Sequence, residues 1–265
     1  MPSAPQLLPT QVAEGSAPGI SYRLEGELVP VLHIALDGSV PVYFEHHVLL
    51  WKYPSMQIDM YPLKKGLVKR LFAGMPIMMI EARSAGEIAF SRDAPGHVVA
   101  RHLQPGEELI VREHQFLAAT TSLEYTFQRM PGVANIFYGG GFFLDQFTAG
   151  DSEGVVWLHG YGNVFEKTLD AGEQIDVEPG SWLYMDSTVN MDQQMYGLKT
   201  GLLGGGGSLI FNRFTGPGRV GIQSAYYHPP GEDTGAGGGG QSNQTQQMPG
   251  GGGLLGGIVG GLLNN

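Results

Sequence analysis

The chain has 265 residues, enough to bury the core of one large domain or of two small ones. Its formal net charge is −10, and an acidic chain without a basic stripe argues against sequence-independent binding to nucleic acid. It contains no cysteine, which excludes a disulfide framework and a thiolate metal site. Glycine contributes 42 residues, about twice the usual share, and predicts many tight turns.

The first residues of the chain, 1–18, are rich in proline and polar side chains, and we expect a flexible N-terminal arm. They lack a basic stretch followed by an apolar run, so they do not resemble a secretory signal peptide. The first arginine is Arg23, which argues against a mitochondrial presequence. No window offers about 18 uninterrupted apolar residues, so we expect no membrane-spanning helix. These features predict a cytoplasmic protein, with peripheral contact at a membrane left open.

Residues 19–228 have the pattern of a single β domain. EELIVREHQFLAAT (107–120) and EQIDVEPGSWLYMDS (173–187) combine partial alternation with β-branched and aromatic residues, which is typical of strands. YPLKKGLVKRLFAG (61–74) is a brief helix candidate of one or two turns. The sequence therefore predicts an all-β fold with almost no helix.

An internal repeat organises this domain. LQPGEELIVREHQFLAATTSL (103–123) matches LDAGEQIDVEPGSWLYMDSTV (169–189) at an offset of 66 residues, so that Gly106 corresponds to Gly172. A weaker copy lies at 36–56, where Gly38 takes the same place. In each copy the glycine supplies a turn with positive φ, and the next strand buries one face.

We therefore expect three tandem β repeats of about 66 residues, at roughly 20–80, 81–147 and 148–228. Three such units either close around a pseudo-threefold axis or stack in sequence. Both arrangements let each unit protect its neighbours' strand edges.

A second pair of similar stretches supports the same period. DQFTAGDSEGVVW (145–157) is similar to NRFTGPGRVGIQ (212–223). In the later copy, Phe214, Gly216 and Gly218 are candidate turn or interaction residues, and Pro217 with its flanking glycines is expected to fix a turn between core strands. If Gly218 has positive φ, Gly218→Val should cost roughly 1–3 kcal/mol of stability.

The eight histidines do not follow a known metal-binding spacing. His46 and His47 are adjacent, so in a strand they face opposite sides. A metal site built across repeats remains open, and its first candidates are His46 and His114, which occupy equivalent positions. There is no Gly-x-Ser-x-Gly elbow and no cysteine. We therefore predict no catalytic residue and no cofactor.

Two further segments suggest contacts rather than chemistry. The GGGG loop at 204–207 precedes a strand and lacks the lysine of a phosphate-binding loop, but it presents Leu202 and Leu203 to a partner chain or lipid. Residues 229–265 are rich in Gly, Gln and Asn and predict a flexible tail. The tail ends in LLGGIVGGLLNN, which is either disordered or a docking segment for a membrane surface or partner groove.

The run WLYMDSTVNMDQQMYGLKTGLLGGGGSLIFNRFTGPGRVGIQS (182–224) resembles a mitochondrial biogenesis family, the altered inheritance of mitochondria protein family, member twenty-four. The matching positions are Met185, Gly201 to Gly207, Phe211, Phe214, Gly216, Gly218 and Val220.

The resemblance implies a repeated β-structure similar to the tryptophan RNA-binding attenuation protein fold, within the double-stranded β-helix group. It also implies kinship with fungal members associated with the mitochondrial inner membrane and with cristae-organising complexes. The chain departs from those members in lacking a presequence.

RNA binding, which the fold analogy suggests, is disfavoured by the charge. The basic cluster consists of Lys64, Lys65, Lys69 and Arg70 in an otherwise acidic chain. Two hypotheses therefore remain for the function. The first is a non-enzymatic, self-associating scaffold that contacts a membrane or larger complex through the Gly-Leu loop and the tail. The alternative is a β-barrel that binds a metal or small molecule, with or without an enzymatic activity.

Overall fold

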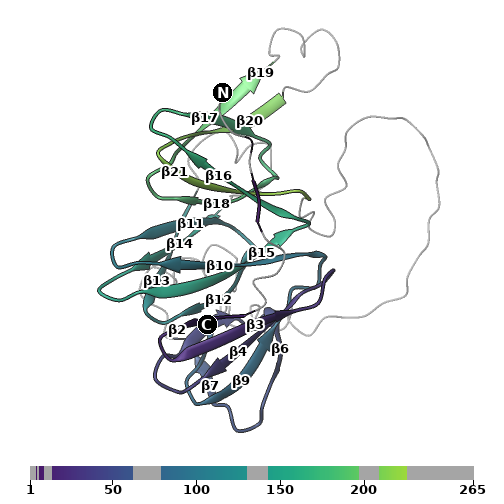
Figure 1. Cartoon of the computed structure of the whole chain (residues 1–265), viewed down its shortest axis with the longest axis vertical. Coiled ribbons are helices and arrows are strands. Elements are labelled where there is room, and N and C mark those ends of the chain that lie inside the picture. The colour runs from purple at the N-terminus through teal and green to yellow at the C-terminus, as the bar shows by residue number, and fades with distance from the viewer. Residues whose placement is uncertain are drawn as a thin grey trace, which may run out of the picture. The chain divides into compact units, whose positions relative to one another are not determined.

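The structure of the chain is a computed structural model that describes residues 4, 6–8, 14–61, 79–129, 143–196 and 209–225. Within these ranges the chain forms β-strands and a single 3-10 helix, η1 (His46–Val48). All strand pairings there are antiparallel. The all-β prediction is confirmed (Figure 1). Among the described residues, no helix has the length and apolar character that crossing a membrane requires.

Three strands precede the three six-stranded segments that make up most of the described chain. They are β1 (Gln6–Leu7), β2 (Glu14–Ala17) and β3 (Ile20–Glu25). β1 pairs with β16, and β2 and β3 form a hairpin that β3 extends by pairing with β4. The segment expected as a flexible arm, 1–18, thus contributes two strands, because its polar residues lie at sheet edges where one strand face meets solvent.

Residues 31–90, which we call the first segment, hold six strands. They are β4 (Val31–Leu36), β5 (Val42–Glu45), β6 (Leu49–Lys52), β7 (Ile58–Met60), β8 (Met79–Ala82) and β9 (Gly86–Phe90). β9 pairs with β4 on one side and with β6 on the other, while β8 pairs with β5 and β7. The helix candidate at 61–74 lies almost entirely outside the described residues.

Residues 96–161, the middle segment, repeat this order. The strands are β10 (Gly96–Leu103), β11 (Glu108–Arg112), β12 (Phe116–Thr120), β13 (Leu123–Arg129), β14 (Phe143–Ala149) and β15 (Gly154–Tyr161). β15 pairs with β10 and β12, and β14 pairs with β11 and β13.

Residues 164–223, the last segment, follow the same order again. The strands are β16 (Val164–Leu169), β17 (Gln174–Val177), β18 (Trp182–Asp186), β19 (Asn190–Tyr196), β20 (Leu209–Thr215) and β21 (Gly218–Gln223). β21 pairs with β16 and β18, and β20 pairs with β17 and β19. The strands predicted at 107–120 and 173–187 are β11, β12, β17 and β18.

Two junctions join the segments. β12 of the middle segment pairs with β5 of the first, and β18 of the last pairs with β11 of the middle. Each junction therefore joins the third strand of one segment to the second strand of the segment before it. The resulting sheets run β10-β15-β12-β5-β8-β7 and β1-β16-β21-β18-β11-β14-β13, so each contains strands of two segments.

Each segment has its own apolar cluster between its sheets. Phe44, Phe90 and Trp157 belong to the first cluster, and Phe116, Phe147 and Tyr184 to the second. Trp182 and Phe214 belong to the third. Because Trp157 and Tyr184 come from the following segment in each case, the clusters as well as the sheets connect the segments.

Candidate functional site

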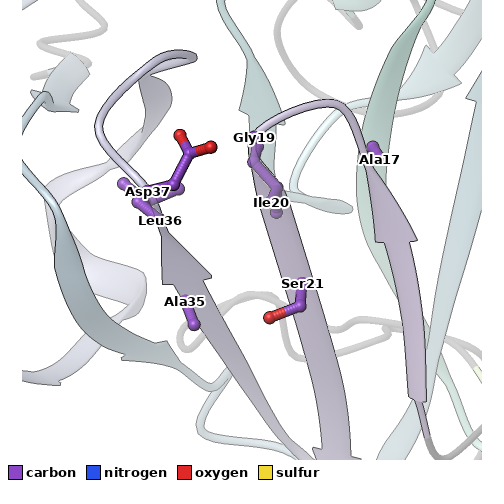
Figure 2. A pocket seen from close by; sticks show the side chains of 7 residues that line it. All are labelled: Ala17, Gly19, Ile20, Ser21, Ala35, Leu36 and Asp37. Carbon is purple, nitrogen blue, oxygen red and sulfur yellow. The ribbon is translucent and has the colours of Figure 1, made fainter.

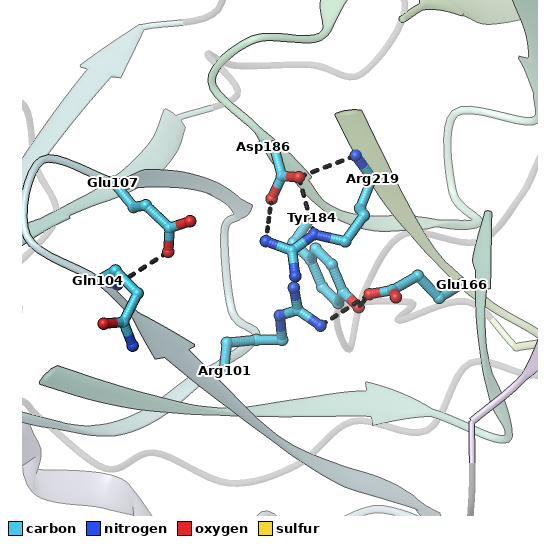
Figure 3. A network of polar contacts seen from close by, with 7 residues as sticks. All are labelled: Arg101, Gln104, Glu107, Glu166, Tyr184, Asp186 and Arg219. Atoms are coloured by element: carbon cyan, nitrogen blue, oxygen red, sulfur yellow. Dashed lines mark hydrogen bonds and ion pairs between the residues drawn. The ribbon is translucent and has the colours of Figure 1, made fainter. Parts of the chain in front are cut away.

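A network of charged side chains links four strands of the middle and last segments (Figure 3). Arg101 of β10 lies 2.8 Å from the Glu166 carboxylate of β16, and the Tyr184 hydroxyl of β18 donates a hydrogen bond of 2.5 Å to the same oxygen. Asp186 of β18 accepts hydrogen bonds from the Arg219 guanidinium of β21 at 2.8 and 3.1 Å. The Arg101 guanidinium also lies 5.0 Å from the centre of the Tyr184 ring.

The network stabilises the junction and is poorly suited to proton transfer. Burial raises the pKa of Tyr184 far above its ordinary value, so its hydroxyl stays protonated and acts as a donor. Glu166 and Asp186 each form an ion pair with a guanidinium, at 2.8 Å in both cases. Nε and Nη2 of Arg101 are buried without a hydrogen-bond partner. Nothing in the sequence signalled this network, because its partners lie on strands that are far apart along the chain.

A second group of buried polar side chains surrounds the start of β12. Arg92 donates a 2.8 Å hydrogen bond to the carbonyl of Phe116, and the backbone N–H of His159 donates to the carbonyl of Gln115 at 2.7 Å. Gln115 and His159 are fully buried. Four buried polar atoms here lack a hydrogen-bond partner in the protein: Nε2 and Oε1 of Gln115, Nδ1 of His159 and Nε of Arg92. Burial, with the nearby Arg92 charge, lowers the pKa of His159 to about 4. His159 is therefore neutral at physiological pH.

The predicted turn glycines have the backbone geometry that the sequence required. Gly38, Gly106 and Gly172 have φ values of 93°, 83° and 78°. At two of them the hydrogen bonds also match: Glu107 N–H donates to Gln104 and Glu173 N–H to Asp170, both at 2.9 Å. The turn at Gly38 differs, because Asp37 Oδ1 accepts hydrogen bonds from the N–H and hydroxyl of Ser39.

The other predicted turn, around Gly218, also forms. Gly218 has a φ of 137°, and a Cβ there would lie 2.7 Å from both Thr188 Oγ1 and Val189 Cγ2. Phe214 is fully buried. Gly216 is constrained by space instead of φ, since an added Cβ would lie 2.4 Å from the carbonyl of Asp170.

His46 and His114, the candidate metal ligands, each have other neighbours. His46 is the first residue of η1, and its ring packs edge-on against His47 at 5.9 Å. His114 has a positive φ of 67°, and its ring lies 3.4 Å from the Glu113 carboxylate. Within the described ranges, no three His, Cys, Asp or Glu side chains come together in a way that would hold a metal ion. Leu202 and Leu203 lie outside the described residues.

A shallow depression lies at one end of β2, β3 and β4, with a volume of about 420 Å³ (Figure 2). Its oxygen-bearing side chains are Ser21 and Asp37, and small or apolar residues form the rest of the lining. Asp37 Oδ1 already accepts two hydrogen bonds from Ser39, which lower the pKa of Asp37. The depression therefore offers a ligand little beyond one hydroxyl group.

The exposed apolar side chains gather in one part of the sequence. Among the described residues, the large apolar side chains with high exposure are Leu28, Val29, Leu50, Tyr53, Met60 and Tyr196. All but the last lie between residues 28 and 60. Leu50 is on β6, which pairs with β9 alone in the described structure. In the last segment, β17 likewise pairs with β20 alone in the described structure. The sequence predictions did not single out either strand edge.

Comparison with known proteins gives a family and a fold. The model of the family described as mitochondrial biogenesis AIM24 matches residues 22–225. No curated protein sequence matches the chain. A crystal structure of protein SPYM3_0169 from Streptococcus pyogenes is similar, with a TM-score of 0.61 and 21% identity. The match covers 78% of this chain and 94% of that one, and at this identity it supports the fold alone.

Proposed function

Because this chain belongs to the mitochondrial biogenesis AIM24 family, and because its exposed apolar side chains cluster in one region, we propose that it is a non-enzymatic interaction protein. In this role it self-associates and serves as a scaffold beside a membrane or within a larger complex. The observation that carries the proposal is the group of exposed apolar residues between 28 and 60. We infer that these side chains, which are close in sequence, form a surface for protein or membrane contact, since large apolar side chains that are exposed together mark such surfaces.

We further propose that the three segments are tandem repeats with a fold similar to the tryptophan RNA-binding attenuation protein. The same strand pairing in all three segments supports this. The interruption of pairing between the third and sixth strands also recurs, at Leu50, Leu117 and Leu183. The pairing favours units of 31–90, 96–161 and 164–223, each of which starts later than expected from sequence, and the units stack in sequence.

The scaffold role is tested by two measurements on the full chain. Light scattering across a concentration series should give a mass above the 28.4 kDa of one chain. Sedimentation with liposomes, and affinity capture from a lysate, should each be repeated after deletion of 229–265 to test the tail as a contact. A chain that stays monomeric and sediments with no liposome would contradict the proposal.

A small-molecule or metal-binding role has one observation in its favour, the buried polar atoms around Gln115, Arg92 and His159 that lack protein partners. Such atoms are usually satisfied by water or by a ligand. Elemental analysis and native mass spectrometry of untagged protein would separate the two roles. A stoichiometric metal or a retained small molecule would favour binding over scaffolding.

A further inference from the structure

The two internal junctions use one strand-pairing arrangement. At the first, Ala118 and Ala119 of β12 lie opposite Phe44 and Tyr43 of β5. At the second, the third strand again meets the second strand of the preceding segment, as β18 pairs with β11. Antiparallel pairing of a third strand with a second strand is therefore how segments of this chain join.

A junction needs a third strand and a second strand, and the first and last segments each leave one of these with an open edge in the described structure. β6 is the third strand of the first segment, and β17 is the second strand of the last. In the described structure β6 has no neighbour beyond β9, and β17 has none beyond β20. The two halves of a junction are thus present on one chain, at opposite ends of its series of segments.

Side-chain exposure at β6 shows what a neighbour would cover. Leu50, Leu117 and Leu183 occupy the same interruption in pairing with the sixth strand. Leu117 and Leu183 are fully buried, whereas Leu50 is 54% exposed. An apolar side chain at this position is suited to burial beneath an added strand.

The side chains of β17 are likewise more exposed than those of β11, the second strand of the middle segment. Ile175 pairs with Phe214 just as Leu109 pairs with Phe147, which aligns β17 with β11 and places Asp176 where the middle segment has Ile110. Leu109 and Ile110 are buried, while Ile175 is half-buried and Asp176 is exposed.

From these edges we propose that β6 of one copy pairs antiparallel with β17 of a second copy. This proposal rests on the self-association in the proposed function and specifies its contact. Transferring the register of the second junction, where Tyr184 lies opposite Val111 and Met185 opposite Ile110, places Lys52 opposite Asp176.

The residues brought together by this register are complementary. Lys52 and Asp176 carry opposite charges across the two strands, and Lys52 would share the Asp176 carboxylate with Arg213, which already pairs with it. Trp51 lies opposite Val177 and supplies the apolar part of the contact. Since the two edges differ, the contact is heterologous and continues into rings or longer assemblies instead of stopping at a dimer. Exposed strand edges are also the surfaces at which identical chains most readily join.

The absence of native cysteine allows a direct test in the full chain. In the double variant Lys52→Cys/Asp176→Cys, the cysteines of neighbouring copies would lie directly opposite each other, within disulfide reach. After mild oxidation, non-reducing electrophoresis should show a ladder of covalent multimers. The matched control is Ser152→Cys/Asp176→Cys, because Ser152 is exposed in the turn between β14 and β15 and lies outside both proposed edges. It should yield no ladder.

A second variant tests the contact without a crosslink. Leu50→Arg should weaken association by at least about tenfold in light scattering, because the contact would bury an unpaired charge. Ser152→Arg, at an exposed turn outside both edges, should leave association unchanged. Circular dichroism would confirm that both variants fold.

The outcomes separate this contact from the broader role. A multimeric wild type whose Lys52→Cys/Asp176→Cys variant gives no ladder would overturn the β6–β17 contact and leave self-association standing. If another part of the chain is found paired with the open edge of β6, the β6–β17 contact is likewise overturned and self-association is left standing. A monomeric wild type with no ladder would overturn both.

Discussion

The middle segment and the outer segments share one order of strands but differ in what covers them. The middle segment has a neighbour on both sides, through β12·β5 and β11·β18, whereas each outer segment has a neighbour on one side. Leu117 is therefore buried and Leu50 exposed, although both follow the same local pattern. The difference teaches that, when segments join through paired strands, the outer segments and not the middle one keep strand edges open for contact.

The largest expected effect comes from truncating the leucine at a covered junction. Leu117→Ala should lower the free energy of unfolding by about 2–5 kcal/mol, because it removes a fully buried side chain and leaves a cavity. Leu50→Ala at the equivalent outer position should change it by less than about 0.5 kcal/mol. Urea denaturation at a protein concentration that disfavours association measures both. Equal losses of unfolding free energy in the two variants would contradict the inferred difference between the covered strand β12 and the open strand β6.

The second prediction concerns pH and the middle segment. The pKa of His159 in the folded chain is about 4, below its ordinary value of 6.5, so protons bind the unfolded state more readily. The stabilisation from neutral His159 is therefore complete above pH 6.5 and is lost as the pH falls through 6.5 towards 4. The loss attributable to this residue is about 3 kcal/mol.

His159→Gln tests this prediction with the residue found at the equivalent place in the last segment. Gln223 and His159 both donate a backbone hydrogen bond of 2.7 Å to the start of the third strand, at Ser181 and Gln115. Stability of the variant should depend less on pH between 6.5 and 4. The control is His114→Gln, since the His114 side chain is 47% exposed. An unchanged pH profile in His159→Gln would show that His159 does not titrate as expected.

The third prediction concerns the last segment. Gly218→Val should cost about 1–3 kcal/mol, because valine disfavours a φ of 137° and its Cβ would contact Thr188 and Val189. Gly172→Val should cost less, since Gly172 has positive φ but no atom within 4 Å of an added Cβ. Thermal unfolding of both variants separates backbone strain from steric overlap. An unchanged melting temperature for Gly218→Val would contradict the turn.

The smallest effect is expected at the outer polar contact of the last segment. Arg213 pairs with Asp176 at 2.7 Å and donates to the Tyr196 hydroxyl at 2.6 Å, in a solvent-accessible position. Exposed ion pairs contribute little to stability. Arg213→Ala should therefore lower the melting temperature less than Leu117→Ala or Gly218→Val does. A shift as large as that of Gly218→Val would mean that the outer edge is held more tightly than its exposure indicates.

The sequence carried the local features of the fold well. Glycine positions identified the turns at Gly106 and Gly172, and partial alternation identified β11, β12, β17 and β18, because turn and strand chemistry are local. The sequence placed the first unit at 20–80, around the turn where the likeness is strongest. The strand pairing instead relates the sixth strand of each segment to its first, a long-range contact that local patterns do not reveal.

Other features depended on neighbours that sequence does not name. Leu50 and Leu117 sit in similar stretches, VLLWK and QFLAA, and only the presence of an adjoining strand decides which is buried. The Arg101–Glu166–Tyr184 network likewise requires strands from two segments to meet. His46 and His114 were placed at equivalent positions from the sequence, and in the described structure they have different neighbours, His47 and Glu113.

The most direct test of contact through open strand ends is the mass of the full chain in solution, measured by sedimentation velocity across a concentration series with and without Leu50→Arg. Contact through these edges predicts that the wild-type mass rises with concentration in multiples of 28.4 kDa and that the variant needs at least about tenfold higher concentration for the same rise. A wild type that stays at 28.4 kDa throughout, or a variant that assembles as well as the wild type, would contradict it.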